Sequence, residues 1–276
     1  MSGSVLEVSG LRKSYGTFAL RDVSFALREG TITGFIGRNG AGKTTTLKCL
    51  LNLVHPDGGE IRFFGLDFAE NELDVKRQMG FVSGGVDFYP RKKLRTITEV
   101  TRRLYSDWDE AAYRNLLRRF SLDEDKTPQQ LSAGMKVKYA LALALSHRAK
   151  LMILDEPTSG LDPVSREELL ELFLQLKEEG ATILFSTHIT SDLDKCADDI
   201  IYIRNGAIAE SDSLDEFISR YLLVRMTERP AGGVIGTRPD RNGYTGLIRK
   251  SDPVPAGAQA SAANLEDIMV HLEKEE

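Results

Sequence analysis

Short apolar runs alternate with segments of helical periodicity along most of the chain. Runs rich in Val, Ile, Leu and Phe that are bounded by Gly, Asn, Asp or Pro predict strands. We expect strands at residues 5–15, 18–27, 33–36, 60–64, 81–82, 151–154, 182–185, 200–203 and 207–209. Apolar residues at helical spacing predict helices at residues 44–54, 71–79, 134–146 and 164–177. Strands that alternate with helices are typical of a parallel sheet, so we predict the α/β class.

Two regions depart from this simple alternation. The first two strands are separated only by a turn at Gly16, which predicts an antiparallel β-layer ahead of the central sheet. Between Thr96 and Phe120 the pattern becomes helical in two segments, and Thr96 and Glu99 have the spacing of a capping box. We interpret residues 86–147 as an inserted helical subdomain.

The composition changes beyond about Tyr221, where Gly, Pro and Ala become frequent. Two strand-like pieces and one helix with an apolar face remain, at residues 222–226, 244–248 and 265–272. We expect a flexible linker at residues 253–263. The chain is therefore divided into a main domain at residues 1–218 and a small C-terminal α/β accessory region at residues 219–276. Packing against the main domain is the first interpretation of this region, because an apolar helical stripe usually belongs to a core.

A glycine-rich segment follows the strand predicted at residues 33–36 and matches the pattern G-x-x-x-x-G-K-[ST]. In this pattern, backbone N–H groups surround nucleotide phosphates, while Lys43 supplies a positive charge and Thr44 offers its hydroxyl to Mg²⁺. The alternative is an ordinary glycine-rich turn, but a strand before the segment and a helix after it favour the phosphate site. The candidate ATP-binding residues are Gly37, Asn39, Gly40, Ala41, Gly42, Lys43, Thr44 and Thr45.

Two carboxylates end the apolar strand predicted at residues 151–154. A phosphate-loop ATPase needs such a pair opposite its loop: Asp155 to hold Mg²⁺, and Glu156 to orient or deprotonate the attacking water. Taken alone, the pair is equally typical of a buried strand that meets a solvated acidic turn.

Charge and composition exclude several classes of protein. The chain has 276 residues, a formal net charge of −5 and a sequence pI of about 5.6, which argues against a generally basic nucleic-acid-binding protein. Cys49 and Cys196 have no metal-ligand spacing to the four histidines, which fits a reducing compartment. No apolar run approaches the ~18 residues that span a bilayer, so we expect another chain to cross any membrane involved.

These motifs occur in the order found in one family, and about residues 5–218 resemble the nucleotide-binding subunit of an ATP-binding cassette (ABC) transporter. Leu131-Ser132-Ala133-Gly134 resembles the family signature L-S-G-G, with Ala133 in place of one Gly. The run from Asp155 to Asp162 is similar to the Walker B and D-loop segments, and Ser186-Thr187-His188 to the switch histidine. Tyr15 lies where the family places an aromatic residue that stacks on adenine.

The resemblance implies a P-loop NTPase core and a head-to-tail dimer, homomeric or heteromeric, in which two ATP molecules lie between facing chains. Ser132, Ala133 and Gly134 would meet the γ-phosphate held by the facing chain. His188 would donate a hydrogen bond to the γ-phosphate and hold Glu156 and the water in register. Each residue also has a structural interpretation: Ser132 as an ordinary N-cap, His188 as a structural residue, and Tyr15 as part of a core or turn.

Gly84 departs from the family pattern. The family usually has Gln there, sometimes Glu, which contacts Mg²⁺ or the water and senses the membrane partner; Asp87 is a candidate substitute. Either Gly84 leaves a ligand position without a side chain, or glycine is needed for a positive φ in the turn with Gly85. The departure bears on the rate of hydrolysis and on coupling, and not on ATP binding.

The sequence therefore predicts a cytoplasmic ATPase with ATP and Mg²⁺ as cofactors, peripheral on the inner face of the plasma membrane. It would drive a separate membrane-spanning permease through ATP-driven dimer closure. The Ser-x-Gly-Met-Lys signature and the C-terminal region resemble bacterial drug or peptide exporters. The alternatives are a soluble ABC-type ATPase acting on nucleic acid or ribosomes, which the acidic balance disfavours, and a regulatory ATP sensor.

Overall fold

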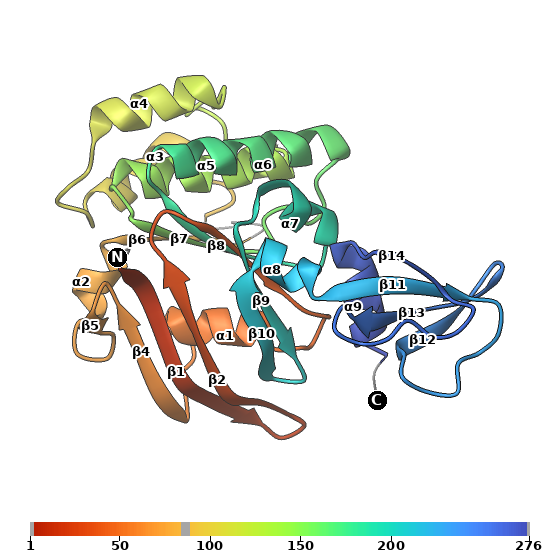
Figure 1. The fold of residues 1–276 in the computed structure, drawn as a ribbon. Coiled ribbons are helices and arrows are strands. Elements are labelled where there is room, and N and C mark those ends of the chain that lie inside the picture. The colour runs from red at the N-terminus through yellow and green to blue at the C-terminus, as the bar shows by residue number, and fades with distance from the viewer. Residues whose placement is uncertain (1–2, 84–88, 275–276) are drawn as a thin grey trace.

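A mixed six-stranded sheet forms the centre of the molecule (Figure 1). The computed structural model describes residues 3–83 and 89–274. The strands of this sheet lie in the order β10-β9-β3-β8-β7-β6, and only β10 runs antiparallel to its neighbour. Their bounds are β3 (Ile32–Ile36), β6 (Met79–Ser83), β7 (Leu151–Asp155), β8 (Thr182–Thr187), β9 (Asp199–Arg204) and β10 (Ala207–Ser213). The predicted α/β class is confirmed.

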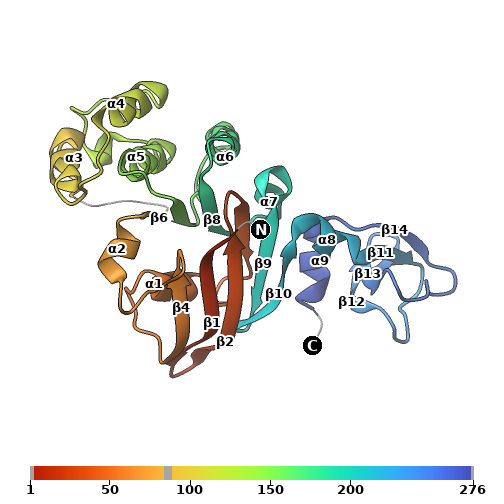
Figure 2. The same ribbon diagram turned by 60° about the vertical axis from the view of Figure 1, so that its left-hand side comes forward.

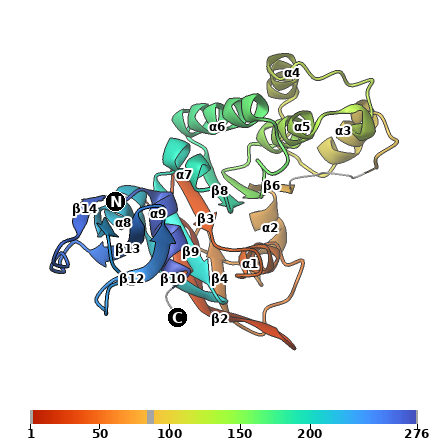
Figure 3. The same ribbon diagram turned by 90° about the vertical axis from the view of Figure 1, so that its right-hand side faces the viewer.

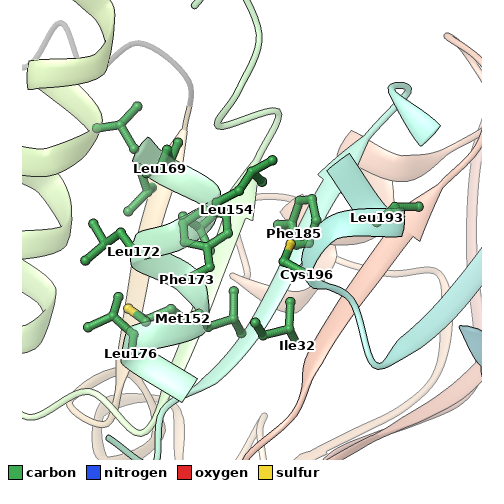
Figure 4. Packing of buried hydrophobic residues seen from close by; sticks show 14 of the residues in the cluster. Ile32, Met152, Leu154, Leu169, Leu172, Phe173, Leu176, Phe185, Leu193 and Cys196 are labelled. Atoms are coloured by element: carbon green, nitrogen blue, oxygen red, sulfur yellow. The ribbon is translucent and has the colours of Figure 1, made fainter. Parts of the chain in front are cut away.

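Successive side chains of a strand point to opposite sides of a sheet. Other elements cover both faces of the central sheet, so both sets of side chains are buried. One face is covered by α6 (Pro163–Glu178). Its Leu172 and Phe173 pack with Met152 of β7 and Phe185 of β8 (Figure 4). The helix α7 (Thr190–Cys196) covers the same face through Leu193. A sheet covered on both faces gives strands that are apolar throughout, as the sequence runs predicted.

The opposite face is covered by α1 (Lys43–Leu50) and by the antiparallel β-layer. The layer has the strand order β2-β1-β4-β5. Its strands are β1 (Ser4–Tyr15), β2 (Phe18–Arg28), β4 (Gly58–Phe63) and β5 (Leu66–Asp67). Leu6, Phe25 and Phe63 of the layer share one apolar cluster with Phe35 of β3 and Ile153 of β7. This cluster fixes the β-layer against the strand that leads into the glycine-rich segment.

The helical subdomain lies beyond the β6 edge of the central sheet (Figure 2). It contains α3 (Leu94–Arg102), α4 (Glu110–Arg119), the 3₁₀ helix Pro128–Gln130 and α5 (Ala133–Ser146). The predicted capping box at Thr96 is wrong, since α3 already begins at Leu94 and Thr96 lies inside its first turn. Two helices are shorter than predicted: α1 ends at Leu50, and α2 (Glu72–Lys76) ends before Met79, which belongs to β6.

The C-terminal region lies at the other end of the central sheet from the helical subdomain, beside β9 and β10 (Figure 3). After α8 (Leu214–Ser219), it forms a sheet of order β12-β13-β11-β14 and the helix α9 (Leu265–Leu272). The strands are β11 (Tyr221–Met226), β12 (Ile235–Asp240), β13 (Gly243–Arg249) and β14 (Gln259–Ala262). The linker predicted at residues 253–263 is wrong in its second half, because β14 pairs with β11 there. Leu265 and Ile268 of α9 belong to the same apolar cluster as α6, so the region packs on the main domain.

Candidate active site

The glycine-rich segment connects β3 to α1, and Lys43 is the first residue of that helix. Gly37 packs against β9 so closely that a Cβ at this position would overlap the carbonyl oxygen of Ile203. Gly42 has φ of +121°, a backbone conformation that residues with a side chain rarely adopt. The loop thus needs glycine at both ends, and the helix that follows directs its N-terminal N–H groups toward the loop.

Lys43 is the buried cation of the site, with 5% of its surface exposed. Its Nζ donates a hydrogen bond of 2.7 Å to the carbonyl oxygen of Gly37 and lies 3.5 Å from Oε1 of Glu156. A buried ammonium group needs such anionic or carbonyl partners to offset lost hydration. The structure therefore brings together the lysine of the glycine-rich segment and Glu156, the carboxylate that follows β7.

The first carboxylate, Asp155, lies at the end of β7 beside two hydroxyl groups. The Oγ of Ser186 donates to Asp155 Oδ1 at 2.6 Å, and the Oγ1 of Thr44 lies 3.4 Å from the same oxygen. A hydroxyl and a carboxylate oxygen suit Mg²⁺, which binds through one or two protein ligands together with phosphate oxygens. Thr44 and Asp155 thus fit the metal position predicted for them. Sequence reasoning missed the contact that Ser186 makes, because β7 and β8 are neighbours only in the folded sheet.

Glu156 follows directly and has a left-handed backbone conformation, with φ of +49°. Such a conformation is uncommon for a residue with a side chain and is found often at functional sites. Its Oε2 lies 2.8 Å from Nδ1 of His188, and its backbone N–H donates to Ser186 Oγ at 2.9 Å. The carboxylate is therefore placed between Lys43 and His188.

A cavity of about 480 Å³ joins these groups. It is lined by Phe18, Arg38, Asn39, Gly40, Gly42, Lys43, Thr44, Thr45, Glu156, Ser159 and His188. Sequence reasoning did not select Phe18, Arg38 or Ser159. Arg38 and Ser159 occupy positions within the motifs to which no role was given, and Phe18 lies outside the motifs. Gly37, Ala41 and Asp155 support the cavity without being part of its lining.

Comparison with known proteins assigns this arrangement to a family. A family model described as "ABC transporter" matches residues 20–159. The chain belongs to the ABC transporter family. It is 30% identical over 224 residues to the ABC transporter ATP-binding protein YtrB of Bacillus subtilis (strain 168), covering 80% of this chain and 76% of that protein.

Two further comparisons agree with the assignment. The bacitracin transport ATP-binding protein BcrA of Bacillus licheniformis is 34% identical over 221 residues, covering 79% of this chain and 72% of the relative. A solved structure titled "Structure of ATP binding subunit of ABC transporter" superposes with a TM-score of 0.69 at 32% identity, covering 77% and 91% of the two chains. The chain is therefore an ABC-type ATP-binding subunit and an ATP hydrolase, with the predicted P-loop NTPase fold.

The ABC signature lies apart from the cavity of the same chain. Ser132 caps α5 and accepts a hydrogen bond from the N–H of Met135 at 3.2 Å, and both Ser132 and Ala133 are exposed. Gly134 is buried, and a Cβ there would contact the side chain of Ser165 at 3.5 Å. None of the three signature residues lines the cavity that contains Lys43. The exposed N-terminus of α5 thus points to solvent.

Asp162 of the D-loop segment lies next to the signature, as the N-cap of α6. Its Oδ1 accepts hydrogen bonds of 3.1 Å from the backbone N–H groups of Val164 and Ser165. The hydroxyl of Ser165, followed by these N–H groups, holds the pKa of Asp162 below its ordinary value. Since Ser165 also faces Gly134, the structure brings the D-loop and signature together on one surface.

Tyr15 ends β1 opposite Phe18, the first residue of β2. Tyr15 is 43% exposed, and the ammonium group of Lys13 lies 5.7 Å from the centre of its ring. Lys13 in turn holds Asp57 in an ion pair of 2.7 Å. Tyr15 is not part of the cavity lining, whereas Phe18 is. Adenine stacking by Tyr15 stays a prediction. Phe18, which pairs with Tyr15 and lines the cavity, is a second aromatic candidate for this contact.

Gly84 and Asp87 lie outside the described residues. The strand that precedes them is described: Ser83, the last residue of β6, pairs with Asp155. Within residues 3–83 and 89–274, no helix is long and apolar enough to cross a membrane.

Proposed function

We propose that this chain powers export by a separate membrane-spanning permease, and that it does so as a head-to-tail dimer that closes on two ATP molecules. The observation that carries the proposal is that the cavity around Lys43 and the signature at the N-terminus of α5 lie apart in one chain. Lys43, Glu156 and His188 surround one cavity, while the exposed N-terminus of α5 at Ser132 lies outside it. A second chain in the opposite orientation would supply the missing signature to each cavity.

The site residues divide the work of hydrolysis. Mg²⁺, when bound with ATP, would neutralise charge on the phosphates, and Thr44 and Asp155 are the residues that would hold it. Lys43 balances negative charge on the same phosphates, and Glu156 orients and deprotonates water. His188 Nδ1 lies 2.8 Å from Oε2 of Glu156 and positions that carboxylate, and the other ring nitrogen, Nε2, would donate to a phosphate oxygen.

An apolar groove in the helical subdomain supports a protein partner in the membrane. It has a volume of about 530 Å³, lies between β6, α3 and α5, and is bordered by the exposed side chains of Tyr89, Val100 and Leu104. Exposed apolar surface of this kind usually marks an interaction site. We assign it to a permease segment, which would place the chain in the cytoplasm, on the inner face of the plasma membrane. Drugs or peptides are the proposed substrates, in line with the similarity to BcrA.

Replacing Glu156 with Gln tests the dimer and the catalytic role together. The amide cannot accept a proton, so we expect turnover to fall by about a hundredfold or more, while ATP binding is retained. The variant should then accumulate as a dimer on size-exclusion chromatography with Mg-ATP, and remain a monomer without it.

Adding Ser132→Arg to this variant provides the control, since a large cation at the N-terminus of α5 would block the facing chain but leave the cavity intact. The double variant should bind ATP and stay monomeric. A Glu156→Gln protein that hydrolyses ATP at the parent rate, or that never dimerises with ATP, would contradict the proposal.

A further inference from the structure

The C-terminal helix α9 lies between the central sheet and the C-terminal sheet (Figures 1 and 2). The Nη1 of Arg204 donates to the carbonyl oxygen of Leu272 at 2.7 Å, and the hydroxyl of Tyr202 donates to Oε1 of Glu273 at 2.7 Å. Both donors belong to β9, in which Tyr202 pairs with Ile36. The end of α9 is thus held by the strand next to the one that enters the loop.

A cleft of about 640 Å³ separates α9 from the loop and from the segment after His188. The C-terminal region contributes Arg238, Glu266, Met269, Val270, Glu273 and Lys274 to its lining. Arg38 and His188 line both this cleft and the cavity that contains Lys43. The two hollows are therefore neighbours that share one arginine and one catalytic-site histidine.

The side chain of Arg38 can reach into either the cleft beside α9 or the cavity that contains Lys43. It is 73% exposed, and its Nη1 lies 3.9 Å from Oε2 of Glu273. Its backbone is held, since its carbonyl oxygen accepts from the N–H of Ala41 at 3.0 Å and from Nζ of Lys43 at 3.4 Å. A fixed backbone with an exposed guanidinium leaves the charge free to turn between a carboxylate and a phosphate, both of which arginine binds well.

We propose that Arg38 is a further phosphate-binding residue and that Glu273 of the C-terminal helix draws it away from the nucleotide. The C-terminal region thereby sets the affinity of the site for ATP. The Arg38 side chain is 73% exposed, the Glu273 side chain is 16% exposed, and 3.9 Å is a long distance for an ion pair. Solvent around the guanidinium weakens the interaction, so Glu273 biases Arg38 and does not lock it. The inference rests on the proposed role of the Lys43 cavity as the ATP site.

Titration of the full chain with a fluorescent ATP analogue and Mg²⁺ tests this role. Glu273→Gln removes the charge but keeps an oxygen that accepts from the Tyr202 hydroxyl, so α9 stays anchored. We expect it to tighten binding by about two- to fivefold, the range of a weak ion pair with a solvent-exposed partner, and to lower KM with kcat unchanged. Arg38→Gln should weaken binding, and Glu273→Gln should have no further effect in the Arg38→Gln background.

Glu266→Gln is the matched control, because Glu266 lies on the same face of α9, about 10 Å along the helix from Glu273. It removes the same charge from the same cleft and should leave affinity unchanged. An equal effect of both glutamine variants, or an effect of Glu273→Gln that persists without Arg38, would overturn the inference. Lys43→Ala distinguishes a failure of the Arg38 inference from a failure of the proposed ATP site. Unchanged binding in this variant means that the cavity is not the ATP site.

Discussion

Lys43 shows how a single buried charge organises the site. Its ammonium group is surrounded by the Gly37 carbonyl and the Glu156 carboxylate, within a loop whose backbone approaches β9 too closely for a side chain at position 37. Burial makes each of these contacts stronger than it would be in water, and makes an unpaired partner costly. The same property makes the lysine suited to phosphate oxygens.

Lys43→Ala should weaken binding of an ATP analogue by about ten- to a hundredfold, the value of one hydrogen bond to a charged group. Fluorescence titration measures the loss. A thermal melt of the same variant serves as the fold control, because the alanine also removes the hydrogen bond to the Gly37 carbonyl. Unchanged affinity would show that the loop is a structural turn.

At the scale of elements, the placement of the signature depends on how closely α5 packs on β6. Gly80 of β6 is buried against this helix, and a Cβ there would lie 2.5 Å from the Cβ of Ala144. The helix can lie this close to the strand only because position 80 has no side chain. Since Ser132 caps the other end of α5, the packing at Ala144 helps to fix the position of the signature.

Gly80→Ala should therefore lower the free energy of unfolding by about 1–3 kcal/mol, as expected for an overpacked contact. Urea denaturation followed by circular dichroism measures the change. Gly16→Ala is the matched control, because a Cβ at the exposed Gly16 meets no atom within 4 Å, and it should change stability by less than about 0.5 kcal/mol. Equal stability of the two variants would contradict the close packing of α5 on β6.

At the scale of the whole molecule, one apolar cluster extends through all parts that cover the α6 face of the sheet. It includes Tyr113 of the helical subdomain, Phe173 of α6, Phe217 of α8, and Ile268 of the C-terminal region. Trp108, the single tryptophan, packs against the same cluster. Elements that share a core lose their packing together, so we expect the C-terminal region and the main domain to unfold cooperatively.

Ile268→Ala should lower stability by about 2–5 kcal/mol, because the fully buried side chain leaves a cavity. If the molecule unfolds as one unit, Trp108 fluorescence and far-UV circular dichroism should both shift to lower urea by the same amount. A Trp108 transition that stays in place while part of the dichroism signal moves would show that the C-terminal region unfolds separately. The division at residues 218 and 219 would then describe two folding units.

Local patterns in the sequence were sufficient for much of the fold. The strand that leads to Asp155, the loop before Lys43 and the N-cap at Ser132 follow from apolar runs, glycine spacing and capping chemistry, which act over a few residues. The prediction failed for a segment whose strand conformation depends on pairing with a distant strand. The Gln259–Ala262 strand was predicted as linker, because its four exposed residues form a strand only by pairing with β11.

The sequence by itself determined which positions of the candidate site have charged side chains, hydroxyl groups or glycine, since each motif lies within a short segment of the chain. Only the tertiary structure decided which of them meet. Parallel pairing of β7 and β8 places Ser186 against Asp155, and the left-handed backbone at Glu156 directs its carboxylate between Lys43 and His188. The contact of Arg38 with Glu273 has no local signal, because it depends on how a helix from the far end of the chain docks beside β9.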